Sequence, residues 1–171
     1  MIILGVDPGS IRTGYGAIQT DGRVHRLLEM GVLTAPPRAS LPQRLFELHR
    51  GITAVIRRLA PDLLAVEDIF HAVNARSALV LGHVRGAIVL AGVQAGLEVA
   101  AFPPATVKSQ VAGYGRAEKG QVALVVSRVL GLGRDEPPGD ATDALAVALC
   151  SAHLSLAPLA LAVQRASARR R

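Results

Sequence analysis

Two short apolar runs in this sequence each end on an acidic residue, and this feature restricts the fold most strongly. Residues 2–6 (IILGV) lead into Asp7, and residues 63–66 (LLAV) lead into Glu67. Continuous apolar runs of this length, bounded by turn residues, are typical of buried strands. Strands buried on both faces need helices on either side of the sheet, so the pattern predicts an α/β domain.

The remaining residues alternate between strand and helix patterns. The expected strands are 2–7, 13–20, 23–35, 63–70 and 97–102, and the expected helices are 41–59, 74–92, 106–115, 116–132 and 140–157. This order predicts a mixed five-stranded sheet with helices on both faces. We expect a single domain over residues 1–157, followed by a basic, disordered tail over residues 158–171.

Composition narrows the function. The formal net charge of +6 and the pI of about 10.7 favour an anionic partner such as nucleic acid, although 17 of the 19 basic residues are arginine, so an arginine-rich proteome also explains the charge. The single cysteine, Cys150, excludes an internal disulfide and a cysteine-built metal site. The longest apolar stretch, residues 79–93, contains His83 and Arg85 and is shorter than the ~20 residues of a membrane span. We therefore expect a soluble, cytoplasmic protein without a membrane partner.

Four of the thirteen acids lie in apolar surroundings, where an unpaired carboxylate is costly. Asp7 and Glu67 end two strands, and if these strands are parallel neighbours the two acids lie side by side at one edge of the sheet. Asp140 and Asp143 begin an apolar helix and share one face of it. Taken alone, Asp140 is equally well explained as a helix cap and Asp143 by the helix dipole.

Converging carboxylates repel one another and stay ionised only where a cation compensates them. Ligation by oxygen alone suits Mg²⁺ or Mn²⁺ rather than zinc. Two such ions, about 3.5–4 Å apart, activate a water molecule and stabilise the leaving oxygen when a phosphodiester is hydrolysed. The acids thus predict a metal-dependent phosphodiesterase site around Asp7.

Four segments carry a resemblance to a known family: ILGVDPGS–TGYG, AVEDIF, VKSQVAGYGRAEKGQV and DATDALAVAL. In this order, from residue 1 to about 155, they resemble the RuvC Holliday-junction resolvases. The resemblance implies an RNase H-like fold, a homodimer, and a crossover junction endodeoxyribonuclease that nicks two like strands symmetrically in recombination and repair. It also implies two Mg²⁺ ions per active site, with Mn²⁺ able to substitute, and the RuvA–RuvB branch-migration complex as a partner.

The resemblance also assigns residues. Asp7, Glu67, Asp140 and Asp143 match the family's four metal-binding acids. Lys108 and Lys119 match basic residues that the family uses near the scissile DNA, and Phe70 matches an aromatic residue implicated in junction contacts. Arg12 stands one place later than the arginine of the DPGSR pattern, so its role stays open.

The residues themselves give further weight to some of these assignments. The two lysines of the chain lie within one twelve-residue window, which favours a function for both, although Glu118 and Lys119 also resemble an ordinary polar helix start. Tyr114, between two glycines, and Arg76 are candidate DNA contacts that could equally face solvent. From the residues alone, Phe70 would be assigned to the core.

The predicted helix over residues 74–92 carries a stripe of small residues, Ala78, Gly82, Gly86 and Ala87. Such a stripe permits close approach of a second helix, as in a two-fold dimer, but packing on the sheet explains it as well.

Three alternative functions remain. A related RNase H-like nuclease of the pre-ribosomal RNA processing type shares the GVDPG-like start. A sugar-kinase or actin-like ATP-binding domain also ends a strand with Asp-x-Gly, but 171 residues are too few for the two domains that close on the nucleotide. A module that grips junctions without cutting would make the acids dispensable.

Overall fold

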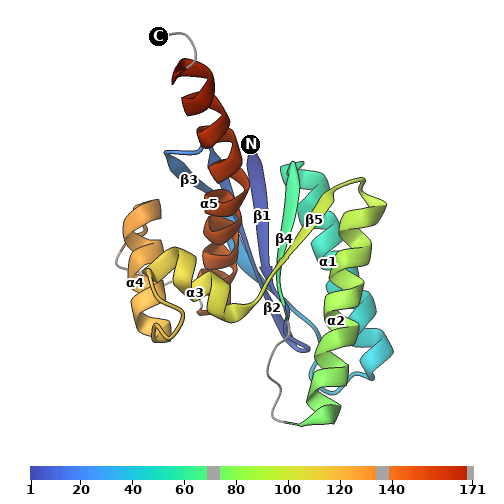
Figure 1. Cartoon of the computed structure of the whole chain (residues 1–171). Helices are drawn as coiled ribbons and strands as arrows, with labels where there is room; N and C mark the ends of the chain where they lie inside the picture. Colours follow the sequence, from blue (N-terminus) through green and yellow to red (C-terminus); the bar gives the residue numbers. More distant parts are fainter. Residues whose placement is uncertain (69–73, 134–138, 169–171) are drawn as a thin grey trace.

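The computed structural model describes residues 1–68, 74–133 and 139–168, with side chains described as far as Leu154 (Figure 1). The elements, in chain order, are β1 (Ile2–Asp7), β2 (Arg12–Thr20), β3 (His25–Thr34), α1 (Leu41–Leu59), β4 (Leu63–Glu67), α2 (Ala75–Gln94), β5 (Glu98–Phe102), α3 (Pro104–Ala112), α4 (Lys119–Leu130) and α5 (Gly139–Ala168). The predicted order of strands and helices is confirmed.

The five strands form one mixed sheet in the order β3-β2-β1-β4-β5. The first three strands pair antiparallel as a meander, whereas β1 pairs parallel with β4, and β4 pairs parallel with β5. The sheet therefore changes from antiparallel to parallel pairing at β1. Because β1 and β4 run in the same direction, their carboxyl ends meet at the same edge of the sheet.

Helices cover both faces of the sheet, as predicted: α1 and α2 pack on one face, and α3, α4 and α5 lie on the other (Figure 1). The strand period of two sends successive side chains of β1 to opposite faces. Ile3 joins the core under α5, while Leu4 and Val6 join the core under α1 and α2. All three side chains are fully buried.

The start of α5 touches the sheet through backbone atoms, because glycines remove the side chains between them. A Cβ atom on Gly14 would lie 1.8 Å from the backbone oxygen of Asp140, and one on Gly5 would lie 2.1 Å from the backbone oxygen of Ala144. A Cβ atom on Gly16 would collide with the Leu145 side chain. We call Gly5, Gly14 and Gly16 the glycine seam; it sets the first turn of α5 directly beside the end of β1.

Several element ends differ from the predictions. β4 ends at Glu67 rather than at residue 70. α3 ends at Ala112 because Gly113 adopts a left-handed backbone with a φ of 86°. α4 begins at Lys119 rather than at residue 116, since Glu118 and Gln121 form a capping box in which the Glu118 amide donates to Gln121 at 2.9 Å.

The last helix is longer than expected. α5 continues to Ala168, whereas we expected it to end at about residue 157. The division into a domain over residues 1–157 and a disordered basic tail over residues 158–171 stays a prediction.

Among the helices of the described residues, α2 has the length and apolar composition of a membrane span, although the apolar stretch within it, residues 79–93, is shorter. One side of α2 is packed in this structure: Val84 and Ile88 are fully buried in the core. On its other side Leu79, Leu90 and Val93 are 64%, 51% and 60% exposed. α2 is therefore a core helix on one side and an uncovered apolar surface on the other.

Candidate active site

The two central parallel strands bring the first pair of acids together. Asp7 is the last residue of β1 and Glu67 is the last residue of β4. Val6 pairs with Val66 in the parallel register, so the next residue on each strand is one of these acids. This juxtaposition is the one predicted from the two apolar runs.

Both strand-end acids have a raised affinity for protons. Burial, together with the negative charges of Asp143 and Asp140, raises the pKa of Asp7 from 3.8 to about 6. Burial and the charge of Asp7 raise the pKa of Glu67 from 4.5 to about 7, and the two carboxyl groups share a hydrogen bond. Near neutral pH the pair therefore retains protons, which a divalent cation would displace on binding.

The helix acids, in contrast, are each held by a basic side chain from another element. Arg12, the first residue of β2, places its Nε 2.7 Å from Oδ2 of Asp140. Lys119, the first residue of α4, places its Nζ 2.5 Å from Oδ2 of Asp143. The hydrogen bond to Asp143 raises the pKa of Lys119, so this lysine stays charged at neutral pH and serves as a donor rather than a base.

A cavity of about 190 Å³ lies between the acids and the lysines. Its lining comprises Glu67, Pro104, Val107, Lys108, Lys119, Val122, Asp143 and Ala146. A neighbouring groove, between α4 and the start of α5, shares Lys119 and Asp143 with this cavity. Lys108 on α3 thus faces the same cavity as Glu67, and the pair of Lys119 and Asp143 separates the cavity from the groove.

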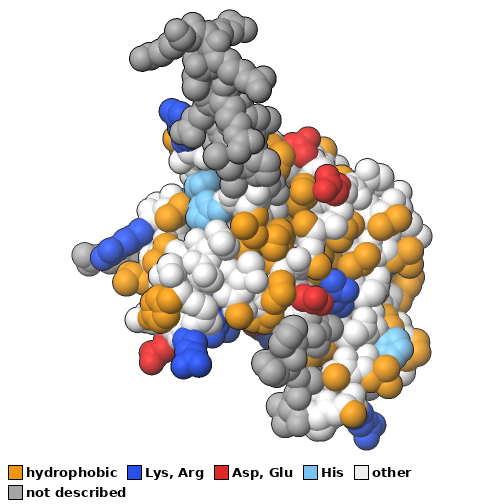
Figure 2. Space-filling model, viewed as in Figure 1, with side chains coloured by type: hydrophobic (Ala, Val, Ile, Leu, Met, Phe, Trp, Pro, Cys, Tyr) orange, Lys and Arg blue, Asp and Glu red, His pale blue; other side chains and the backbone are white. Residues whose placement is uncertain are grey.

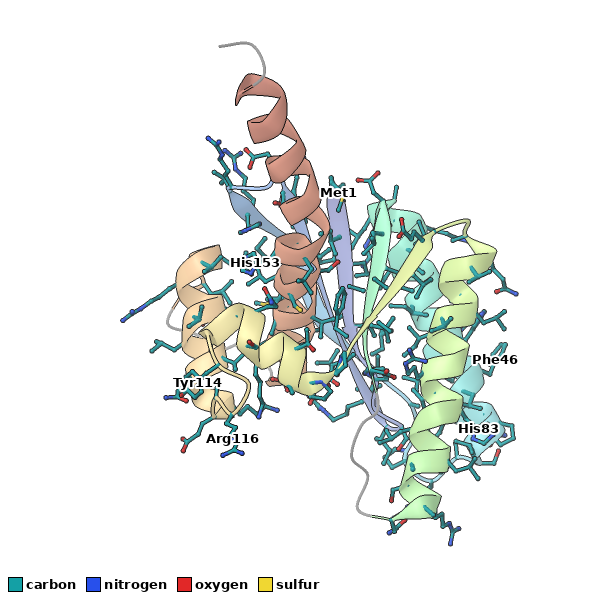
Figure 3. All side chains as sticks on the ribbon, in the orientation of Figure 1. Met1, Phe46, His83, Tyr114, Arg116 and His153 are labelled. Carbon is teal, nitrogen blue, oxygen red and sulfur yellow. The ribbon has the colours of Figure 1, made fainter. Side chains whose placement is uncertain are left out.

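The other predicted DNA contacts lie elsewhere. Tyr114 is 47% exposed on the α3–α4 connection, beside Arg116 in Figure 3, and its hydroxyl donates to the Gln121 side chain. Arg76 is exposed in the first turn of α2. Neither residue lines the cavity. Phe70 lies outside the described residues.

The residue types present fit a hard divalent cation. All four acids offer oxygen ligands. Burial first, and the negative charge of neighbouring acids second, raise the pKa values of Asp7 and Glu67. Within the described ranges, no three acidic, histidine or cysteine side chains are arranged to hold one metal ion. Arg12 and Lys119 contact Asp140 and Asp143, so an ion bound by the helix acids would compete with these two side chains.

Two features of the site were missed in the sequence. The partner of Arg12 is 128 residues away along the chain, and no local pattern points to it. The glycine seam did leave a signal, since glycines at positions 14 and 16 share one face of a strand and mark a close approach of other backbone.

Comparison with known proteins places the chain among nucleases. The profile of the family described as crossover junction endodeoxyribonuclease RuvC matches residues 3–151. The RuvC protein of Halorhodospira halophila is 49% identical over 160 residues, covering 94% of this chain and 95% of that protein. The RuvC protein of Chloroflexus aggregans is 45% identical over 153 residues, covering 90% and 93%.

Solved structures agree. The chain is similar to T. thermophilus RuvC in complex with Holliday junction substrate, with a TM-score of 0.85 and 35% identity over 91% of this chain and 94% of that one. The yeast mitochondrial Holliday junction resolvase Ydc2 matches with a TM-score of 0.65 at 12% identity, covering 88% of this chain and 77% of that one, a likeness in fold alone.

Proposed function

This chain belongs to the RuvC family of crossover junction endodeoxyribonucleases, and we propose that its four clustered acids form the catalytic metal site. It is a Holliday junction resolvase on an RNase H-like fold, and an RNA-cutting nuclease of the pre-ribosomal type is not favoured. The observation that carries the proposed site is the meeting of the two strand-end acids with two acids near the start of α5, whose charges act on the strand-end pair.

The family is metal-dependent, and for this chain we propose two Mg²⁺ ions, with Mn²⁺ able to substitute. Bound there, the ions would activate water and stabilise the leaving oxygen of a phosphodiester. In this proposal Asp7, central among the acids, and Glu67 hold metal once they lose their protons. Asp140 and Asp143 complete the ligand set from the helix.

The basic residues are proposed to act on the DNA backbone. Lys119 stays protonated and lies at the acids, so its ammonium is available to a phosphate whose charge grows during hydrolysis. Lys108 lines the same cavity and is proposed to contact the DNA strand there. Tyr114 and Arg76 are exposed, which supports a role in DNA binding. The same role for Phe70 stays a prediction from the resemblance.

Symmetric nicks require two active sites, and we propose that the protein works as a homodimer through α2. Cβ atoms on Gly82 and Gly86 would meet nothing within 4 Å, so this part of the small-residue stripe does not pack on the sheet. Hydrophobic side chains gather over α2 along the right-hand edge of the face in Figure 2. Leu79 on α2 and Phe46 on the neighbouring α1 are each 64% exposed. A second copy would cover this apolar surface.

The family resemblance alone supports two further proposals. We expect the protein to act in the cytoplasm and to cooperate with the RuvA–RuvB branch-migration complex.

The decisive experiment is cleavage of a labelled synthetic four-way junction, beside a matched linear duplex and an RNA–DNA hybrid, in Mg²⁺, Mn²⁺ or EDTA. We expect paired symmetric nicks in the junction alone, with both metals and not in EDTA. Cleavage that persists in EDTA would contradict the metal site. Cleavage of the hybrid in preference to the junction would restore the RNA nuclease.

A further inference from the structure

The sequence left the role of Arg12 open, and the structure pairs it with one of the four acids. Its Nε contacts Asp140 Oδ2 at 2.7 Å, while its side chain is 54% exposed and that of Asp140 is 34% exposed. The contact uses an oxygen that the proposed metal site also needs. The guanidinium of Arg12 therefore pairs with the Asp140 carboxylate at the place where a metal ion would bind it.

The approach of Arg12 to Asp140 is set by rigid backbone on both sides. Arg12 and Gly14 are two residues apart on β2, so both face α5. Gly14 touches the backbone of Asp140 across the glycine seam. Between them Thr13 is fully buried, and its hydroxyl donates to the Gly9 carbonyl at 2.9 Å, which fixes the turn that leads into β2.

The exposure of the pair makes it weak and reversible. An ion pair near solvent contributes little to stability, because water competes for both groups and two long side chains lose freedom. Arg12 can therefore leave Asp140 for solvent at small cost. A buried pair would hold the acid too strongly for this exchange.

We propose that Arg12 is a positioning residue that holds Asp140 in the metal-free protein and yields it to a divalent cation, so that Arg12 sets the metal concentration at which the site fills. The inference rests on the proposed metal site and assigns a role to a residue outside the four acids. Lys119 has the corresponding contact with Asp143, but it is also proposed to act on the phosphate. A change at Arg12 therefore tests the effect of the ion pair on metal binding without this second role.

The first test is calorimetric titration of Mn²⁺ into the full chain without DNA. Arg12→Ala should bind Mn²⁺ about two- to fivefold more tightly than wild type, the range expected from losing a weak surface pair. Arg12→Lys keeps the charge but lacks the Nε contact, and should fall between the two. The matched control is Lys108→Ala, which removes a cation from the cavity lined by Glu67 and Asp143. Lys108 forms none of the ion pairs seen in the described residues.

The second test is thermal unfolding in EDTA. Arg12→Ala should lower the melting temperature by about 1–3 °C in the wild-type background and leave it unchanged in the Asp140→Asn background. This double-mutant cycle reports the pair itself, without metal and without cleavage.

Unchanged or weaker Mn²⁺ binding by Arg12→Ala would overturn the inference. An equal increase in Mn²⁺ affinity in Lys108→Ala would also overturn it. The effect would then come from the loss of any nearby positive charge and not from the contact between Arg12 and Asp140. Failure of wild type to bind Mn²⁺ at all would contradict the proposed metal site as well. Normal junction cleavage together with unchanged affinity in Arg12→Ala would contradict the role of Arg12 alone.

Discussion

The two pairs of acids in this site are placed by different means. Asp7 and Glu67 end strands in the middle of the sheet, are partly buried, and share protons with each other. Asp140 and Asp143 lie near the start of a helix, and each is held by a cation from another element. The strand pair is rigid and strained by charge, whereas the helix pair is compensated by exchangeable partners.

This difference indicates which acids of the site are held in position before a metal ion binds. Strand register alone sets the positions of Asp7 and Glu67. The helix acids depend on how α5 docks and on whether Arg12 and Lys119 release them.

The largest expected effect comes from the centre of the strand pair. Asp7→Asn should lower junction cleavage by about 10³-fold or more, because the amide cannot supply the anionic oxygen that the proposed metal site would require. Binding of the junction should change little. The measurement is single-turnover cleavage beside a gel-shift titration. Joint loss of binding and of fold would show instead that Asp7 is structural.

The second-largest effect is expected from a substitution that moves the helix acids away from the strand acids. Gly14→Ala puts a Cβ atom 1.8 Å from the Asp140 backbone oxygen, so α5 must move away from the sheet. We expect a loss of about 2–4 kcal/mol in the free energy of unfolding, as for overpacked interiors, and slower cleavage by the folded fraction. Urea unfolding measures the first effect.

Its control is Gly133→Ala, at a position where a Cβ atom meets nothing within 4 Å. Equal stability losses in the two variants would mean that the glycine seam does not hold α5.

The charge strain of the strand pair predicts a pH dependence. The pKa values of Asp7 and Glu67 are raised to about 6 and about 7 in the folded protein, so the native state binds more protons than the unfolded chain. In EDTA, stability should therefore fall as the pH rises from about 4 to about 8, by up to about 6 kcal/mol, and then level off.

Comparing variants with wild type makes this prediction more specific, because titrating groups elsewhere in the molecule contribute equally to both. Glu67→Gln should remove most of the fall between pH 5 and pH 8 in urea unfolding experiments, while Asp143→Asn should leave most of it. A slope that survives Glu67→Gln would assign the pH dependence to groups outside the strand pair.

The smallest effect on cleavage should come from Lys119, the cationic partner of Asp143. Lys119→Ala should slow cleavage about 10- to 100-fold, since one donor near the reacting phosphate is lost while the acids remain. Junction affinity should fall much less. Steady-state cleavage with parallel binding measurements separates the two. An unchanged rate would reduce Lys119 to a partner of Asp143.

Much of the fold could be predicted because its signals are local. Continuous apolar runs marked β1 and β4, and the acids at their ends marked the edge where they meet. The helix acids could be predicted as a pair from their spacing. The cost of unpaired carboxylates in apolar surroundings already joined the two pairs into one metal site, and the family resemblance agreed with it.

The remaining features depend on contacts between distant segments. The docking of α5 relies on glycines in β1 and β2 that only matter once the helix lies against them. The pairing of Arg12 with Asp140 depends on the side-chain conformation of an exposed arginine. The start of α4 at Lys119 was missed because Glu118, an acid within a charged stretch, turned out to be the helix cap.

The glycine seam also has a consequence for how such a chain can diverge. At Gly5 and Gly14 the main chain of the sheet lies against the main chain of α5, so any side chain gained at these two positions would push the helix acids away from the strand acids. Divergence at these positions is therefore tied to the geometry of the site, even though neither residue carries a functional group.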